Sequence, residues 1–244
     1  MPKAKLNKNY QSLTLIYSHL MRNIRYDYWA DYIYDISSKY VNRKAKALEL
    51  GAGNGRLAFF MKKYFKDLVI SDLSHFMLAD SKNNKLKRVC CDMVSLPFKV
   101  NFDLIYSAFD SVNYLLTTKR MTKLFSEIKN YLTNDGIFTF DVSLERNSIH
   151  HFNKPLVEGK VKNITYEHES RYTKKNRIHK NSFKINLPDG TILKETHRQK
   201  IYHFEDYFKL FEKEGLFVVD CLDAFSFNDG KPTSNRVQFI LKKQ

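Results

Sequence analysis

The stretch Ala47-Leu48-Glu49-Leu50-Gly51-Ala52-Gly53-Asn54-Gly55-Arg56 joins a short apolar run to three glycines at alternate positions. The apolar run is typical of a buried strand, and the residues from Leu57 to Lys63 are typical of a helix. Because glycine has no Cβ atom, Gly51 and Gly53 allow a ligand to lie against the backbone, and Gly55 relieves crowding at the helix start. A plain strand-to-helix turn is the alternative. The three glycines instead predict a binding turn for a nucleotide-like ligand.

Segments with strand and helix patterns alternate on both sides of this turn. Two helical segments with apolar spacing are expected within residues 10–40, and helices are expected at 118–132, closed by a turn at 133–136, and at 204–213. Seven strands are expected, at 47–50, 67–72, 88–92, 102–108, 136–141, 215–220 and 236–242. The alternation predicts an α/β fold, with a mostly parallel sheet covered by helices on both faces and closed by a hairpin of the last two strands.

A β-rich block interrupts the alternation. Residues 164–187 and 191–202 have strand composition and are joined by Pro188-Asp189-Gly190, a strong hairpin signal. We therefore expect one domain over residues 1–244, with a helical cap at 1–44, a core at 45–146 and 203–244, and a small antiparallel β insertion at 147–202.

The composition limits location and partners. The 244 residues carry a formal charge of +15, mostly from scattered lysines. This charge indicates either an RNA or other anionic partner or a lysine-biased, solvated surface. No apolar run approaches the roughly 20 residues of a membrane helix, and no secretory signal is visible, so we expect a cytoplasmic protein without a membrane span. Three cysteines give neither a disulfide framework nor metal-ligand spacing, and no metal site is expected.

Carboxylates at three expected strand ends restrict the ligand. The glycine spacing G-x-G-x-G differs from the dinucleotide pattern, and no Gly-Lys-Ser/Thr of a phosphate-binding loop follows. Asp72 suits a ribose diol and Asp92 an exocyclic amine such as that of adenine, whereas Glu49, Asp72 and Asp92 together would repel a polyphosphate. A nucleoside that carries a cation or zwitterion meets these requirements, and S-adenosylmethionine is such a ligand.

These stretches resemble the class I S-adenosylmethionine-dependent methyltransferases. Residues 49–55 are similar to their first motif, Asp72 to their ribose-binding acid, Asp92-Met93 to the pair beside adenine, and residues 102–108 to the strand whose end faces the methyl donor. The resemblance implies a Rossmann-like seven-stranded sheet. It also implies cofactor contacts from Tyr17, Trp29, Glu49, Gly51, Ala52, Gly53, Asp72, Leu73, Asp92, Met93 and Ala108.

Other stretches resemble a subgroup of bacterial small-molecule methyltransferases that includes aminosugar N-methyltransferases. Residues 17–21 and 26–32 are similar to the N-terminal helices that fold over the cofactor in that subgroup, and residues 109–115 and 195–202 are similar to further signatures of it. The antiparallel insertion resembles its lid over the substrate. This resemblance implies substrate contacts from Asp110, Asn113, Tyr114, His197 and Arg236.

Methyl transfer from a sulfonium is an in-line displacement in which alignment supplies much of the acceleration. A protonated amine or a hydroxyl acceptor needs a general base, for which His197 is the first candidate, and Asp110 and Tyr202 are the other expected catalytic residues. The alternatives are a solvated strand position for His197, a turn cap for Asp110 and Asn113, and core packing for Tyr17 and Trp29. His150-His151 is expected to be a loop pair.

The leading hypothesis is an enzyme that transfers a methyl group from S-adenosylmethionine to N or O of a small polar acceptor, with S-adenosylhomocysteine as product. A tRNA or rRNA methyltransferase and a non-catalytic, cofactor-binding partner subunit are the alternatives. The sequence after the fourth strand, Ser107-Ala-Phe-Asp-Ser111, lacks the Asn-Pro-Pro-Tyr type motif and argues against methylation of an adenine base. A monomer or a homodimer is expected.

Overall fold

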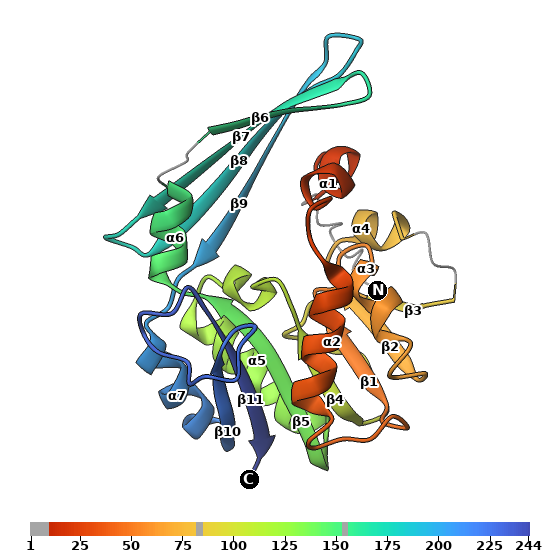
Figure 1. The fold of residues 1–244 in the computed structure, drawn as a ribbon, viewed down its shortest axis with the longest axis vertical. Helices are drawn as coiled ribbons and strands as arrows, with labels where there is room; N and C mark the ends of the chain where they lie inside the picture. The colour runs from red at the N-terminus through yellow and green to blue at the C-terminus, as the bar shows by residue number, and fades with distance from the viewer. Residues whose placement is uncertain (1–9, 82–84, 153–155) are drawn as a thin grey trace, which may run out of the picture.

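Two β-sheets organise the chain (Figure 1). The computed structural model describes residues 10–81, 85–152 and 156–244. The first sheet has seven strands in the order β10-β11-β5-β4-β1-β2-β3. Their bounds are β1 (Ala47–Leu50), β2 (Leu68–Asp72), β3 (Lys87–Cys90), β4 (Phe102–Ser107), β5 (Leu132–Ser143), β10 (Leu216–Asp223) and β11 (Arg236–Lys243).

The pairing within this sheet is mostly parallel. Strands β1 to β5 pair in parallel, whereas β11 runs antiparallel to both β5 and β10. The predicted seven-stranded, mostly parallel α/β fold is therefore confirmed, including the closing hairpin. Because β4, β1 and β2 are parallel neighbours in the sheet, their carboxyl ends lie at the same edge, where open α/β sheets bind ligands.

Helices cover both faces of the sheet and bury its apolar side chains. On one face, α5 (Thr118–Tyr131) and α7 (Phe204–Lys213) contribute Phe125 and Phe211, which pack against Phe140 of β5. On the other face, α2 (Tyr26–Ser37) and α3 (Arg56–Met61) pack over β1. Strands covered on both faces are almost continuously apolar, which explains the fully buried run Ala47–Leu50.

Strand β5 begins earlier than the sequence pattern predicts. Residues 133–136 were expected to form a turn after the preceding helix. In the structure, Leu132 already pairs with Phe102, and regular pairing resumes from Leu104 with Ile137 after an irregularity. The turn-forming residues are therefore accommodated as an irregular segment within the strand.

The second sheet projects away from the core (Figure 1). It is antiparallel, in the order β6 (Leu156–Val161), β7 (Ile164–Thr173), β8 (Ile178–Asn186) and β9 (Ile192–Lys200). The predicted antiparallel insertion is confirmed. The sequence did not reveal α6 (Glu145–Phe152), which precedes it, so the expectation that His150 and His151 lie in a loop was wrong.

The N-terminal segment bridges the two sheets. Helix α1 (Thr14–Leu20) and the residue before it contribute Ile16 and Leu13 to an apolar cluster with Tyr166, Phe183 and Ile185 of the second sheet. Two short elements complete the fold, α4 (His75–Ala79) after β2 and the 3-10 helix η1 (Ser111–Tyr114) after β4. Within the described residues, no helix is long and apolar enough to cross a membrane.

Candidate active site

The glycine turn after β1 forms one wall of a cavity of about 600 Å³ at the carboxyl ends of the parallel strands. Gly51 and Gly53 have φ values of +66° and +57°, in the left-handed region that favours glycine. A Cβ atom on Gly51 would lie 2.8 Å from Cβ of Ser111, and one on Gly53 would lie 3.2 Å from Cε of Met77. The absence of side chains here lets the turn lie close to α4, which follows β2, and to η1, which follows β4.

Asp72, at the end of β2, is fixed beside this turn. One carboxylate oxygen accepts from the backbone N–H of Gly53 at 2.8 Å, and the other accepts from the N–H of Ser74 at 2.7 Å. Burial raises the pKa of Asp72, and these backbone hydrogen bonds oppose the rise. The carboxylate lines the cavity in a fixed orientation.

Glu49 lies deeper in the same wall. Its side chain is buried, and Oε2 accepts a hydrogen bond of 2.9 Å from the hydroxyl of Tyr106. Burial raises the pKa of Glu49 to about 8, although the bond from Tyr106 acts in the opposite direction. A cation in the cavity would favour the ionised form of this acid.

The third acidic residue, Asp92, forms an ion pair. Nη2 of Arg120 in α5 donates to both carboxylate oxygens of Asp92, at 3.0 and 2.8 Å. Both residues line the cavity, as do Met93, Ala52 and Leu73. Arg120 was not identified from the sequence, because it comes from a helix that carries no ligand-binding motif.

The N-terminal cap covers this part of the cavity. Tyr17 lines it, and its hydroxyl lies 3.7 Å from the position that a Cβ atom on Gly53 would occupy. Trp29 and Ala108 do not line it. Trp29 packs against Phe109, with ring centroids 4.2 Å apart, and Ala108 is buried. Cofactor contact by these two residues stays a prediction, and the position of Trp29 favours the core-packing alternative.

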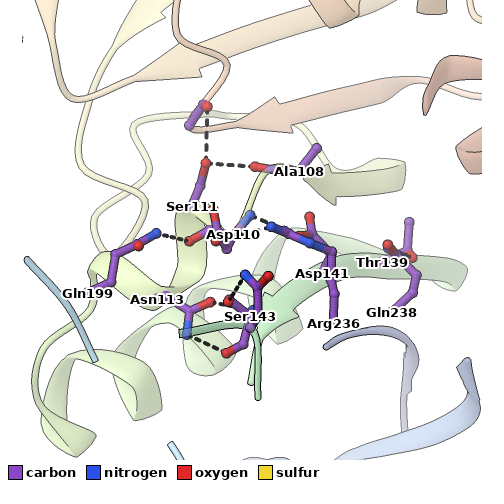
Figure 2. A network of polar contacts seen from close by, with 12 residues as sticks. Ala108, Asp110, Ser111, Asn113, Thr139, Asp141, Ser143, Gln199, Arg236 and Gln238 are labelled. Atoms are coloured by element: carbon purple, nitrogen blue, oxygen red, sulfur yellow. Dashed lines mark hydrogen bonds and ion pairs between the residues drawn. The ribbon is translucent and has the colours of Figure 1, made fainter. Parts of the chain in front are cut away.

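The end of β4 carries a strained turn and a buried charge cluster (Figure 2). Phe109 and Asp110 are consecutive non-glycine residues with φ values of +58° and +49°. The N–H of Asp110 donates to Asp141, and the guanidinium of Arg236 donates to Asp110 at 3.2 Å and, in a close contact, to Asp141. Such strain persists only where the surroundings hold the backbone, often at functional sites.

The opposite charges in this cluster counteract the effect of burial on the pKa values of its members. Burial would lower the pKa of Arg236, but Asp110 and Asp141 raise it, so the guanidinium stays charged. Burial raises the pKa of Asp141 to about 6, and Arg236 limits the rise. Asp110 and Arg236 both line the cavity, and the acceptor contacts expected of them stay a prediction.

The other residues predicted for the acceptor side divide into two groups. Tyr114 lines the cavity and accepts a hydrogen bond of 2.8 Å from the hydroxyl of Tyr10. Asn113 and Tyr202 do not line it. Asn113 bonds the backbone of Ser143 and Lys200, and the Tyr202 hydroxyl donates to the carbonyl of Leu115. These contacts join the β4 loop to neighbouring segments, and a role in the reaction stays a prediction for both.

Strand β9 supplies His197 from the second sheet. The ring is buried and lies against Tyr10, with centroids 4.4 Å apart. Nε2 lies 3.0 Å from Glu195 Oε1, although the two groups lack the alignment of a hydrogen bond. Glu195 also accepts from the backbone N–H groups of Tyr10, Ser12 and Leu13, the last two at 3.0 and 2.9 Å. One carboxylate therefore ties the second sheet to the N-terminal cap.

Comparisons with known proteins identify the type of enzyme. A family described as "Methyltransferase domain" matches residues 47–136. A "putative methyltransferase" of Geobacillus sp. (strain WCH70) is 27% identical, over 96% of this chain and 99% of its own length. The matched domain and the full-length relative together support a class I S-adenosylmethionine-dependent methyltransferase.

Two solved structures show the same fold. An S-adenosylmethionine-dependent methyltransferase from Clostridium acetobutylicum has a TM-score of 0.80 and 24% identity, covering 96% of this chain and 98% of its own. A sugar N-methyltransferase from Streptoalloteichus sp. has a TM-score of 0.76 and 14% identity, covering 100% of this chain and 96% of its own. The methyltransferase thus shares its architecture, including the second sheet, with these enzymes.

The cavity of the methyltransferase fits S-adenosylmethionine. Its volume of about 600 Å³ lies within the range of small-molecule sites. The glycine turn offers a surface without side chains, and Asp72 and Asp92 supply fixed carboxylates at neighbouring strand ends, as a nucleoside requires. Glu49 adds a buried acid to the same cavity wall, and its contact with the cofactor stays a prediction.

Several polar side chains at the end of the cavity formed by the second sheet were missed from the sequence. They line the cavity from α6, β7, β8 and β9: Asn147, His151, His168, Ser170, His179, Asn181 and Gln199. A signal was present, because uncharged polar residues alternate along β7 and β8 with Glu, Arg and Lys. This alternation places the two sets on opposite faces of the sheet.

Proposed function

We propose that the enzyme methylates a nitrogen or oxygen of a small polar acceptor bound between the end of β4 and the second sheet. One observation carries the proposal. A single cavity extends from the glycine turn and Asp72 to the uncharged polar face of β7, β8 and β9. A donor held at one end would therefore face an acceptor held at the other. The sugar N-methyltransferase of the same fold supports this substrate class.

The residues of the chain have separate roles in this proposal. Asp72 holds the ribose, Asp92 the adenine edge, and Glu49 with Tyr17 the methionine end of the cofactor. When bound, S-adenosylmethionine would supply the methyl group from its sulfonium. The acceptor's lone pair would form the new bond to the methyl carbon as the bond to sulfur breaks, which leaves the neutral sulfide S-adenosylhomocysteine. Asp110 orients the acceptor. His197 takes the acceptor's proton, and Glu195 stabilises the resulting imidazolium.

The test is methyl transfer from labelled S-adenosylmethionine to a mixed pool of small metabolites and tRNA. We expect label in the small-molecule fraction with the wild-type enzyme and much less with Asp72→Ala. Label confined to tRNA would contradict the proposal.

An RNA acceptor is a second candidate, favoured by the outer face of the second sheet. Within the described part of the chain, Lys180, Lys194 and Arg198 on this face form no ion pair, and Lys180 lies directly opposite Arg198. Like charges opposed across strands destabilise a sheet unless an anion lies over them. RNA binding through these residues would weaken steeply as the salt concentration rises. Replacing Lys180, Lys194 and Arg198 together by Gln should make this salt dependence less steep. Binding that is absent at low salt would exclude this candidate.

A further inference from the structure

The inner face of the second sheet forms a distinct chamber at the acceptor end of the cavity. We call it the polar chamber and define it by its side chains from α6, β7, β8 and β9, which are His151, His168, Ser170, His179, Asn181 and Gln199. None carries a fixed charge. Within the described residues, no group of three His, Cys, Asp or Glu side chains could hold a metal ion, so these histidines are not gathered for a metal.

Hydrogen bonds and ring contacts fix the polar chamber before any ligand enters. Oδ1 of Asn181 accepts from the hydroxyl of Ser170 at 2.8 Å and lies 2.9 Å from Nε2 of His168. The His168 ring stacks on Phe183, with centroids 4.4 Å apart and planes 10° apart. Gln199 donates to the carbonyl of Asp110 at 3.4 Å, which joins the polar chamber to the end of β4 (Figure 2). A preorganised set of donors and acceptors of this kind suits hydroxyl groups.

The electrostatics of the polar chamber are negative on balance. Burial lowers the pKa of His151, His168 and His179, so these rings are uncharged at neutral pH. The fixed charges beside them are Asp110 and Arg236, with Asp141 behind. Since Arg236 is bonded to both carboxylates, the three groups carry one surplus negative charge. Asp110 raises the pKa of His151 and His179 against burial, while Arg236 opposes this at His151, so the charge cluster lies close to the polar chamber.

Among the described lining residues, no unpaired cation lies in the polar chamber to receive an anionic group. Three arginines line the cavity in the described part of the chain. Arg120 is paired with Asp92, Arg236 with two carboxylates, and Arg56 lies over the ring of Tyr26 at 4.8 Å, near the cofactor end. A phosphate or carboxylate in the polar chamber would therefore meet surplus negative charge without a counterion.

We propose that the polar chamber is the acceptor site and that the acceptor is a hydroxylated amine without phosphate or carboxylate groups. The ammonium form is drawn to Asp110, and the hydroxyls bond the imidazoles and carboxamides. The bound ammonium then passes one proton to the imidazole of His197, which becomes an imidazolium beside Glu195, and the neutral amine keeps the lone pair needed for attack. This inference rests on the proposed function and adds nitrogen as the methylated atom.

The decisive experiment is calorimetric binding to enzyme loaded with S-adenosylhomocysteine. The probes are glucosamine, glucose and glucosamine 6-phosphate, which differ by one charged group at a time. We expect glucosamine to bind at least tenfold more tightly than either of the others, a factor that corresponds to about 1.4 kcal/mol. Equal or tighter binding of the phosphorylated probe, equal binding of glucose, or no binding of glucosamine would overturn the inference.

Variants locate the preference in the chain. Asp110→Asn should reduce the affinity for glucosamine about tenfold and leave that for glucose unchanged, whereas retained S-adenosylhomocysteine binding shows that the variant is folded. His179→Gln should weaken both sugars. Its matched control, Lys180→Gln, changes the next residue of β8 on the opposite face and should alter neither. Undiminished glucosamine selectivity in Asp110→Asn would contradict the proposal.

The proposal and the proposed function fail in different ways. Methyl label recovered from the metabolite pool can be separated by ion exchange into cationic and anionic products. Label in anionic small molecules would keep the proposed function and overturn the amine acceptor. Label on RNA alone would contradict the proposed function itself.

Discussion

The two ends of the cavity are built in different ways. At the cofactor end, the cavity wall is formed largely by backbone. A turn of three glycines and a carboxylate bound by backbone N–H groups, Asp72, lie within 22 residues of one another along the chain. At the proposed acceptor end, side chains from α6, β7, β8, β9 and the β4 loop converge from a stretch that extends from Asp110 to Gln199. A local backbone device can be recognised from a short motif. A chamber assembled from side chains becomes visible only when the strands are paired.

The largest expected effect is at the cofactor end, which should make the stability of the protein depend on pH. The pKa of Glu49 is raised by burial from 4.5 to about 8, so the folded protein keeps a proton there that the unfolded chain has lost. Glu49 therefore makes its full contribution to the free energy of unfolding below pH 4.5, and this contribution is lost as the pH rises toward about 8. Glu49→Gln should remove that fall, which for a shift from 4.5 to about 8 amounts to about 4–5 kcal/mol of unfolding free energy, measured by urea denaturation at several pH values. A pH dependence identical to that of the wild type would exclude Glu49 as its source.

The second-largest effect is expected at the junction of the two ends. Arg236→Met would leave Asp110 and Asp141 without their shared cation, and removing one partner of a buried ion pair typically costs 3–5 kcal/mol. Because the Arg236 side chain is 21% exposed, we expect the lower end, about 3 kcal/mol of unfolding free energy, measured by urea denaturation. Arg236→Lys keeps the charge and should lose less. Equal losses in the two variants would show that the charge is not what matters there.

The third effect in size should come from a change in ligand binding at the cofactor end alone. Asp72→Ala removes a fixed carboxylate from the cavity and should weaken S-adenosylhomocysteine binding by about 2 kcal/mol, the scale of a hydrogen bond to a charged group. Calorimetry measures the loss. His179→Gln, at the acceptor end, serves as the control and should bind S-adenosylhomocysteine as the wild type does. If both variants lost affinity equally, the separation of the two ends would be refuted.

The smallest expected effect concerns the tie between the cap and the second sheet. Glu195→Gln keeps the shape of the side chain but weakens the bonds from three backbone N–H groups, which should cost about 1 kcal/mol. Faster hydrogen exchange in residues 10–20 would reveal it. Glu169→Gln is the matched control, because its ion pair with Arg171 is exposed and contributes little. Exchange rates that match in the two variants would argue against the tie.

The same contrast explains what could be predicted from the sequence. The positions of the core strands along the chain followed from apolar runs and glycines, whereas their order in the sheet did not. The placement of Glu49, Asp72 and Asp92 in the cavity wall followed from their positions at or after those runs. His168, His179 and Asn181 were missed because each is an ordinary strand residue until β7 and β8 pair. Arg120 was missed for the same reason, since it reaches Asp92 across 28 residues from a helix. Helix α6 was missed because its apolar spacing is weak and four of its eight residues are Asn, Ser and His.

The carboxylate of Glu195 has a consequence for the timing of turnover. It binds the N-terminal segment at one end of the cavity and belongs to a strand that lines the other end, so an acceptor bound at the proposed site would steady both segments. An inert acceptor analogue should therefore trap S-adenosylhomocysteine and slow its escape. The enzyme would then release its two products in a fixed sequence, with the methylated molecule departing first.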